Sequence, residues 1–344
     1  MFGRSKNTPW AYDYDINFTT AQSVLALRLI GFVFDVSDGA TKHAGNENKL
    51  DKAPSLIDTL AYFYSFFGFL VGPQYSYSLY NRYMSGRIFV KDGKRIEVNT
   101  TIPAMKKFVV AIFYLIINQL GQSKFPMESL NTKEFSMFPF YWRVVYIVIA
   151  GQFTIAKYIF IWLLSESSCI ASGISFKGFD AHGNADFSLL TNIDHVLFNS
   201  ATSLGDIIAS FNINTNLWIK TYIFKRLKFL GSKQLSSIIS LLFLALWHGF
   251  HPGYFFCFSL EFFMMEAEQR WIRRLSGKTP KALNKVVGFF WAKFGLCYSF
   301  IAFERLSFSK FYSVYSDLYF IGHIVPILLI IFDVVWKKPK AKKQ

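Results

Sequence analysis

Long apolar runs separated by polar segments dominate the chain. Six of these runs approach or exceed about 20 residues, the length that crosses a bilayer as a helix. They occupy residues 54–73, 103–121, 138–164, 235–265, 286–303 and 318–336. A weaker run, residues 23–36, is interrupted by Arg28. The pattern predicts an all-α, polytopic membrane protein with roughly seven to nine membrane helices.

The polar segments carry further signals. Residues 87–98 alternate apolar and polar positions around Asp92-Gly93, which predicts a β-hairpin. The basic tail, residues 336–344, predicts a cytosolic C-terminus. In that tail, Lys340 and Lys342 have the spacing of a dilysine retrieval signal, which indicates residence in the endoplasmic reticulum and contact with a retrieval coat. The alternative is that these lysines only form a basic segment after the last membrane helix and carry no retrieval signal. No internal repeat is found, and residues 1–344 are expected to form a single domain.

Composition supports the membrane interpretation. Of the 344 residues, 52% are hydrophobic and only 17% are charged, which excludes a disordered chain and a typical soluble enzyme. The formal net charge of +15 would suggest nucleic acid in a soluble protein. Here the basic residues lie mostly beside apolar runs, so an excess of Lys and Arg in cytosolic loops explains them better, and no nucleic acid partner is expected. Anionic headgroups or a polyphosphate ligand could use some of them.

His248 is the first candidate for chemistry. It follows a long apolar run, in the sequence Leu246-Trp247-His248-Gly249. Ionisable residues are expensive in a bilayer and therefore tend to be functional. A neutral imidazole can accept the proton of an alcohol as a general base. The alternative is a buried structural histidine that hydrogen-bonds a neighbouring helix.

A second polar site precedes His248. Asn212, Asn214 and Asn216 lie just before Trp218. One of these amides could orient an acyl carbonyl or stabilise its developing charge. The alternative is a loop with a helix cap, because Asn is a favoured capping residue.

The segment that follows combines basic and aromatic residues, among them Lys225, Arg226 and Lys228. Such a stretch suits the membrane interface, and it would also suit the phosphates of coenzyme A. His248 and His251 could share a metal ion, but the other histidines are scattered singly, so no metal is expected.

Several of these motifs, in this order, resemble the membrane-bound O-acyltransferase family, and within it the lysophospholipid acyltransferase branch. The motifs are 212–218, 222–231 and 246–249, with supporting stretches at 29–31, 38–39, 70–75 and 178–179. The resemblance extends from about Leu25 to the C-terminus.

The resemblance implies a helical fold around an internal tunnel, with His248 and Asn212 as the catalytic pair. Asn212 lies six residues before Trp218, as the family's asparagine does; Asn214 and Asn216 remain alternatives. Trp218, Trp247, Lys225, Arg226 and Lys228 are candidate substrate-binding residues. No cofactor is implied, because acyl-CoA is a co-substrate. The implied acceptor is lysophosphatidylcholine, with lysophosphatidylethanolamine and lysophosphatidylserine as further candidates, and the implied acyl groups are polyunsaturated.

The chain departs from the family at its start. Members carry additional membrane helices before the stretch that matches residues 17–31, and here only a short polar segment without a signal peptide precedes it. We therefore expect the N-terminal membrane helices to be missing, which leaves activity open. Two other functions stay possible: a protein O-acyltransferase of the same superfamily, and a non-catalytic lipid transporter or scramblase.

Overall fold

A computed structural model of the chain describes residues 19–41 and 46–335. The expected retrieval signal at Lys340 and Lys342 and the N-terminal segment before Thr19 lie outside these residues. Most described residues are helical, and the only strands among them form two antiparallel pairs of two-residue strands. The chain divides into two compact units. Unit 1 comprises Met1–Leu115, Tyr158–Ile193 and Asn212–Ser236, and unit 2 comprises Ile116–Lys157, Asp194–Phe211 and Ser237–Gln344.

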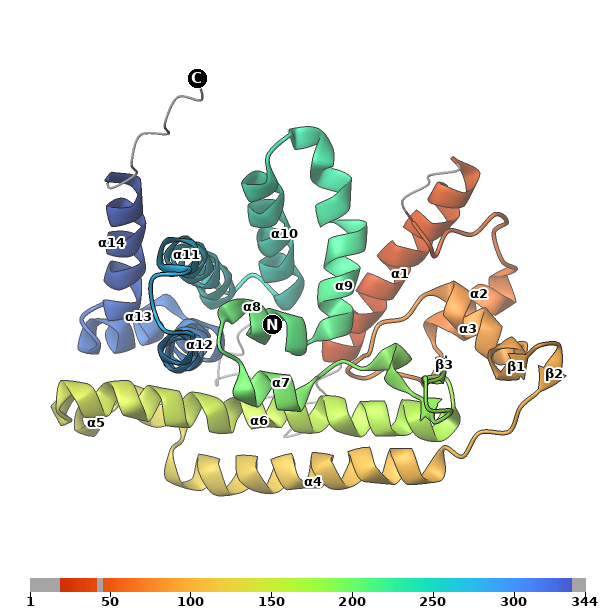
Figure 1. Cartoon of the computed structure of the whole chain (residues 1–344), viewed down its shortest axis with the longest axis horizontal. Coiled ribbons are helices and arrows are strands. Elements are labelled where there is room, and N and C mark those ends of the chain that lie inside the picture. The colour runs from red at the N-terminus through yellow and green to blue at the C-terminus, as the bar shows by residue number, and fades with distance from the viewer. Residues whose placement is uncertain (1–18, 42–45, 336–344) are drawn as a thin grey trace, which may run out of the picture. The chain divides into compact units, whose positions relative to one another are not determined.

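Two long helices contribute residues to both units. They are α4 (Thr101–Lys124) and α6 (Phe140–Ser172) (Figure 1). Both correspond to predicted membrane runs. Within unit 2, the side chain of Asn118 on α4 donates a hydrogen bond of 2.8 Å to the carbonyl of Phe153 on α6. An amide paired in this way removes an unsatisfied polar group from an apolar helix pair.

Unit 1 is built from short elements beside parts of α4 and α6. Its elements are α1 (Thr19–Ala40), α2 (Leu56–Phe63), α3 (Tyr77–Met84), η1 (Arg87–Phe89), β1 (Val90–Lys91), β2 (Lys94–Arg95), β3 (Gly178–Phe179), β4 (Ala185–Asp186), η3 (Ser188–Leu190), α9 (Ile213–Tyr222) and η4 (Phe224–Leu230). β1 and β2 form the predicted hairpin, with positive φ angles at Asp92 and Gly93. α1 and α9 lie side by side (Figure 1). They approach so closely that a Cβ atom on Gly31 would lie 2.9 Å from Nε1 of Trp218.

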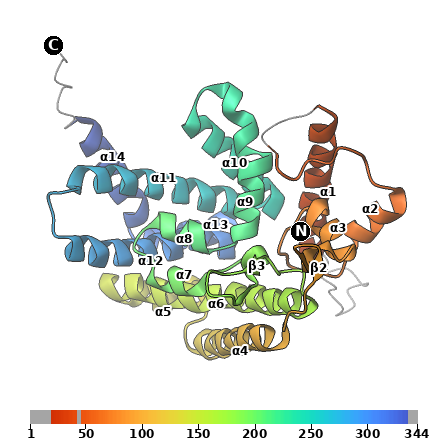
Figure 2. The ribbon, with the colours of Figure 1, turned by 45° about the vertical axis from the view of Figure 1, so that its right-hand side comes forward.

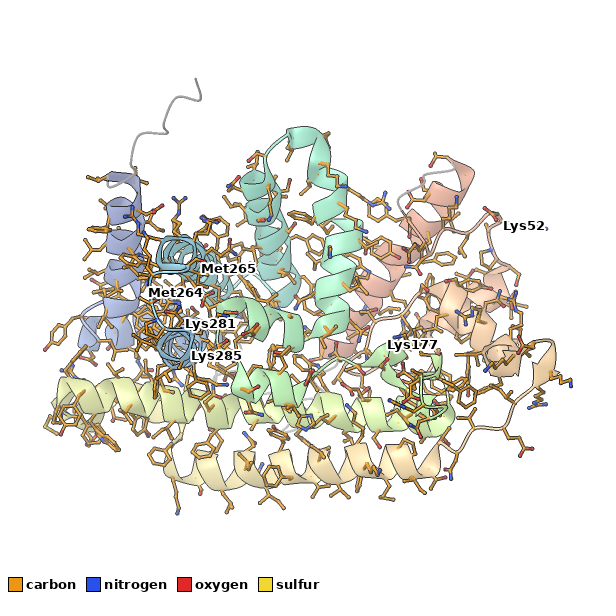
Figure 3. All side chains as sticks on the ribbon, in the orientation of Figure 1. Lys52, Lys177, Met264, Met265, Lys281 and Lys285 are labelled. Carbon is orange, nitrogen blue, oxygen red and sulfur yellow. The ribbon has the colours of Figure 1, made fainter. Side chains whose placement is uncertain are left out.

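Unit 2 contains η2 (Met127–Asn131), α5 (Lys133–Met137), α7 (His195–Ser200), α8 (Leu204–Ser210), α10 (Lys233–His248, its first residues in unit 1), α11 (Pro252–Leu275), α12 (Lys281–Arg305), α13 (Phe308–Asp317) and α14 (Ile321–Val335). α11 and α12 lie side by side, and α14 packs against both (Figures 1 and 2). Fully buried side chains such as Met264, labelled in Figure 3, and Tyr298 form the core.

Two predicted membrane runs differ from the structure. Residues 54–73 form only the short helix α2, followed by turns in which Gly68 and Gly72 have φ angles of 59° and 91°. The buried guanidinium of Arg28 donates hydrogen bonds to the carbonyls of Tyr62 and Phe63. In a continued helix these carbonyls would accept hydrogen bonds from backbone N–H groups of the next turn. Residues 235–265 form two helices, α10 and α11, with a break at residues 249–251.

Among the described residues, three helices are long and apolar enough to cross a membrane: Thr101–Asn131, Phe140–Ser172 and Lys281–Arg305. α13 and α14, bent by 72° at a short break, add a fourth if they form one span. The predicted number of seven to nine is not confirmed. The prediction that residues 1–344 form a single domain stays a prediction.

Candidate active site

His248 is the last residue of α10. Gly249, directly after it, has a φ angle of 133°, a conformation that residues with a Cβ atom rarely adopt. α11 then begins at Pro252, which suits the first turn of a helix because it needs no N–H donor. The chain therefore breaks on the C-terminal side of the histidine and leaves it at a helix end.

Aromatic rings surround the imidazole of His248. Its ring centroid lies 4.6 Å from that of Trp247, 5.0 Å from Phe303, 5.4 Å from Tyr254 and 5.5 Å from Phe258. The side chain nevertheless keeps partial exposure. No hydrogen bond to the imidazole is found within residues 19–41 and 46–335. Packing against rings thus fixes the imidazole while its nitrogen atoms stay available to a hydroxyl group.

An apolar groove of about 250 Å³ adjoins this site and shares Phe258 with it. The groove lies between α10 and α11, and its lining residues are Ile238, Leu241, Leu242, Ala245, Phe255, Phe258, Ser259, Phe262 and Phe263. Eight of these nine side chains are apolar, so the groove suits a hydrocarbon chain.

Close packing places Phe303 beside the histidine. The N–H of Gly253, at the start of α11, donates a hydrogen bond of 2.9 Å to the carbonyl of Leu306. A Cβ atom on Gly253 would lie 2.1 Å from the carbonyl oxygen of Ala302. Only a glycine permits this approach of α11 to the end of α12.

Asn212, in unit 1, immediately precedes α9 in the left-handed conformation, with φ 51° and ψ 47°. Its side chain makes no capping hydrogen bond to α9, in contrast to the capping alternative considered from the sequence. The Oδ1 atom instead accepts a hydrogen bond of 3.3 Å from Nδ2 of Asn192. A residue other than glycine in this conformation is strained, and such strain is common at functional sites.

Asn192 anchors the start of α9. Its carbonyl accepts from the N–H of Ile213 at 2.9 Å, and its Oδ1 accepts from the N–H of Asn214 at 3.0 Å. The side chain of Asn214 donates to the carbonyl of Thr191 at 2.8 Å, which gives that amide a structural role. Asn216 is half-buried and lies on a different part of α9.

Glu166, on α6, holds Asn192 in turn. It is only 2% exposed, and its Oε1 accepts from the backbone N–H groups of Asn192 at 2.7 Å and Ile193 at 2.9 Å. Its Oε2 forms an ion pair of 2.8 Å with Nζ of Lys107 on α4. Sequence reasoning missed Glu166 and Asn192. An acidic residue beside an apolar run was the available signal for Glu166; for Asn192 there was none.

The other candidate residues have distinct surroundings. Trp218 is buried and lines a polar cavity of unit 1, and Trp247 contacts His248. Lys225 and Lys228 are exposed. They lie three residues apart in the 3₁₀ helix η4, and such residues share a face.

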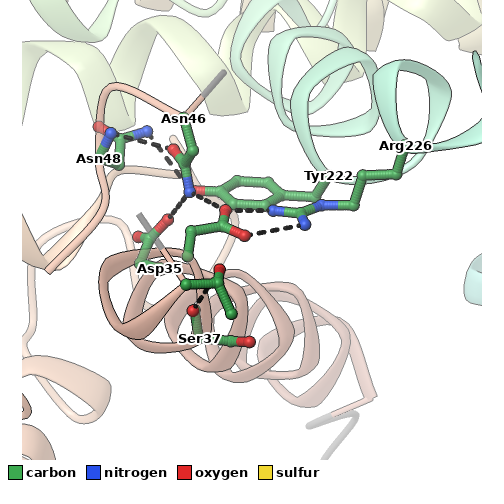
Figure 4. Close-up of polar contacts among 8 residues, drawn as sticks. Asp35, Ser37, Asn46, Asn48, Tyr222 and Arg226 are labelled. Atoms are coloured by element: carbon green, nitrogen blue, oxygen red, sulfur yellow. Dashed lines mark hydrogen bonds and ion pairs between the residues drawn. The ribbon is translucent and has the colours of Figure 1, made fainter. Parts of the chain in front are cut away.

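Arg226 is engaged within unit 1. Its Nη1 and Nη2 atoms bind the carboxylate of Asp38 on α1 at 3.1 and 2.5 Å, an ion pair drawn in Figure 4. Its guanidinium lies 3.9 Å from the ring centre of Phe34. A phosphate would have to compete with that carboxylate. The proposed role of Arg226 in substrate binding stays a prediction.

The structure brings the candidate residues together in two groups. Asn212, Trp218 and the basic residues of η4 belong to unit 1, whereas His248 and Trp247 belong to unit 2. Among the residues that the structure describes, no group of three or more His, Cys, Asp or Glu side chains could hold a metal ion.

Comparison with known proteins identifies the class. The sequence model of the membrane-bound O-acyltransferase family matches residues 10–309. The chain belongs to this family, and it is therefore an acyltransferase of the membrane. The predicted family and the predicted all-α, polytopic membrane fold are confirmed.

Named relatives indicate which members of the family the chain resembles. The chain is 37% identical to lysophospholipid acyltransferase 5 of Homo sapiens over 96% of its own length and 71% of that protein. It is 30% identical to lysophospholipid acyltransferase 5 of Caenorhabditis elegans, over 95% of this chain and 73% of the relative. It is 29% identical to the lysophospholipid acyltransferase of Schizosaccharomyces pombe, over 92% of this chain and 67% of the relative.

Replacing Glu166 tests the buried anchor. Glu166→Ala leaves two buried N–H groups and Lys107 without their partner, so we expect the free energy of unfolding to fall by about 3 kcal/mol. Unfolding by detergent titration of the purified protein measures this change. Glu166→Gln should lose less, because its carbonyl oxygen still accepts the N–H groups. Equal losses in both variants would contradict the assigned hydrogen bonds.

Replacing Asn192 tests the support of Asn212. Asn192→Ala removes the partner of the Asn212 side chain, so we expect kcat for acyl transfer to fall about tenfold, with a smaller change in KM. Asn199→Ala is the control, because Asn199 is exposed and its amide bonds within α7. A kcat equal to that of the control would show that Asn212 needs no such support.

Proposed function

We propose that this chain transfers a fatty acyl group from acyl-CoA to the free glycerol hydroxyl of a lysophospholipid. The proposed acceptor is lysophosphatidylcholine, with lysophosphatidylethanolamine and lysophosphatidylserine as further acceptors, and the proposed acyl groups are polyunsaturated. The proposed location is the endoplasmic reticulum membrane, with the dilysine spacing of Lys340 and Lys342 as a contact for a retrieval coat. The names of the relatives, lysophospholipid acyltransferases, support the lipid class.

One observation carries the proposal. The imidazole of His248 is held by aromatic rings, partially exposed, and adjoins a groove that suits a hydrocarbon chain. An acyl chain in this groove would place a thioester near a base. A protein O-acyltransferase could share the base, but the named relatives favour a lipid acceptor.

The reaction needs few groups. His248 takes the hydroxyl proton as the oxygen attacks the thioester carbonyl, and the new ester bond forms as the carbon–sulfur bond breaks. Coenzyme A leaves as a thiolate and takes up a proton. Asn212 orients the donor or stabilises the charge that develops on the carbonyl oxygen. No acyl-enzyme is needed, because holding alcohol and thioester together supplies much of the rate.

The phosphates of coenzyme A have candidate partners in η4. Lys225 and Lys228 are exposed on one face, whereas Arg226 is bound to Asp38. We assign phosphate contact to the two lysines first. Arg226 would contribute by holding η4 against α1.

Replacing His248 tests the base. His248→Gln keeps a polar side chain of similar volume but provides no basic nitrogen, so acyl transfer from labelled acyl-CoA to lysophosphatidylcholine should fall at least about a hundredfold. His182→Gln, at an exposed hairpin, is the matched control. Near-normal turnover of His248→Gln would remove the base assignment.

A second pair of variants tests which asparagine acts. Asn212→Ala should lower turnover more than Asn216→Ala, because Asn212 is the residue held in the strained conformation by Asn192. Both variants are assayed with the same donor and acceptor. The reverse order would assign the role to Asn216.

A further inference from the structure

Unit 1 contains a polar cavity of about 390 Å³ that the proposed transfer step does not use. α9 contributes Asn214, Leu217, Trp218, Thr221 and Tyr222 to its lining. These positions follow the helical repeat and form one face of α9. The remaining lining comes from α1, the segment after it, α2, the approach to α3, α3 itself and η3. All of these elements belong to unit 1.

Two charged side chains deep in the cavity are held by neutral neighbouring groups. Arg28, which is 1% exposed, donates to backbone carbonyls and lies 4.6 Å from the ring centre of Tyr75. Asp35, also 1% exposed, accepts from Asn46 and from the hydroxyl of Tyr222, each at 2.8 Å (Figure 4). The inner wall is therefore polar, and it keeps the positive charge of Arg28, which has no ion-pair partner among the described residues and whose Nε atom has no hydrogen-bond partner there.

Two opposite charges at the lining remain exposed. Glu47 lies on the segment between α1 and α2, and Arg82 lies in the last turn of α3. Neither side chain has a hydrogen-bond or ion-pair partner among the residues that the structure describes. A ligand that carries one positive and one negative group would match this pair.

The wall also offers aromatic rings and one free acceptor. Trp218 and Tyr222 are buried, with ring centroids 5.2 Å apart, and faces of such rings attract quaternary ammonium groups. Gln74 is only 7% exposed; its Nε2 donates to the carbonyl of Val24, while its Oε1 has no partner among the described residues. A hydroxyl group of the ligand could donate to that oxygen.

We propose that this cavity binds the zwitterionic headgroup of a glycerophospholipid. Arg82 contacts the phosphate, and Glu47 with the rings of Trp218 and Tyr222 receives the ammonium group. Coenzyme A fits poorly, because its several phosphates would meet the exposed carboxylate of Glu47, with Arg82 as the one exposed cation in the lining. The choice of lipid class rests on the proposed function. The lipid is either the lysophospholipid acceptor or a phospholipid of the bilayer.

The experiment measures binding in the absence of turnover. Full-length protein carrying His248→Gln is purified in detergent and labelled with photoactivatable lysophosphatidylcholine, lysophosphatidylglycerol, which lacks the ammonium group, or diacyl phosphatidylcholine. Glu47→Gln and Arg82→Gln are added singly. Their matched controls are Glu97→Gln and Lys52→Gln; both residues are exposed and outside the cavity, and Lys52 is labelled in Figure 3.

We expect labelling of cavity peptides by the choline lipids. Arg82→Gln should weaken labelling by all of the lipids about fivefold. Glu47→Gln should abolish the preference for lysophosphatidylcholine over lysophosphatidylglycerol. Stronger labelling by the lysolipid assigns the cavity to the acceptor, and stronger labelling by the diacyl lipid assigns it to a bilayer phospholipid; both support the inference.

Two results would overturn the inference: labelling of Glu47→Gln and Arg82→Gln equal to that of their controls, or loss of the cavity label when coenzyme A is added. Because binding is read without turnover, a protein that binds the headgroup but transfers no acyl group would contradict only the proposed function. A protein that transfers acyl groups without this labelling would contradict only the headgroup site.

Discussion

The break in the chain at Gly249 is the constraint on which the site of unit 2 depends. A φ angle of 133° at Gly249 ends α10 at His248 and lets α11 begin four residues later, at Pro252. The same break allows Gly253 to approach the end of α12, which brings Phe303 against the imidazole. A continuous helix through this region would bury the histidine in a regular turn and remove the groove between α10 and α11. The backbone conformation of one glycine thus determines where the imidazole of His248 lies and what it adjoins.

Unit 1 uses a different principle to position its catalytic candidate. A buried carboxylate is expensive unless hydrogen bonds and a counter-charge compensate it, and Glu166 has both. Through Asn192 this arrangement fixes the first residues of α9 and gives Asn212 a side-chain partner. Rings hold His248, whereas a polar network holds Asn212. The first arrangement leaves the imidazole nitrogens without a partner among the described residues, and the second gives the amide of Asn212 one partner that favours a single orientation.

Sequence patterns predicted the features that depend on local composition. The apolar runs that became α4, α6 and α12 are long enough to require a helix in a bilayer, and the structure has a helix at each. His248 was recognisable as an ionisable residue at the end of an apolar run, and Asn212 by its spacing from Trp218 and by family resemblance. Two other features depend on contacts between distant residues. Residues 54–73 form only the short helix α2 and turns, and Arg28, distant in sequence, binds two of their carbonyls. The support of Asn212 by Asn192 and Glu166 joins segments 20 and 26 residues apart, which no local pattern reveals.

The central claim is that the imidazole of His248 removes the hydroxyl proton. Chemical rescue tests this most directly: His248→Gly is supplied with free imidazoles of graded basicity, and acyl transfer to lysophosphatidylcholine is measured for each. The account predicts very low turnover without imidazole and a rescued rate that rises with the pKa of the added base. Normal turnover of His248→Gly without any imidazole, or rescue that does not depend on basicity, would contradict it.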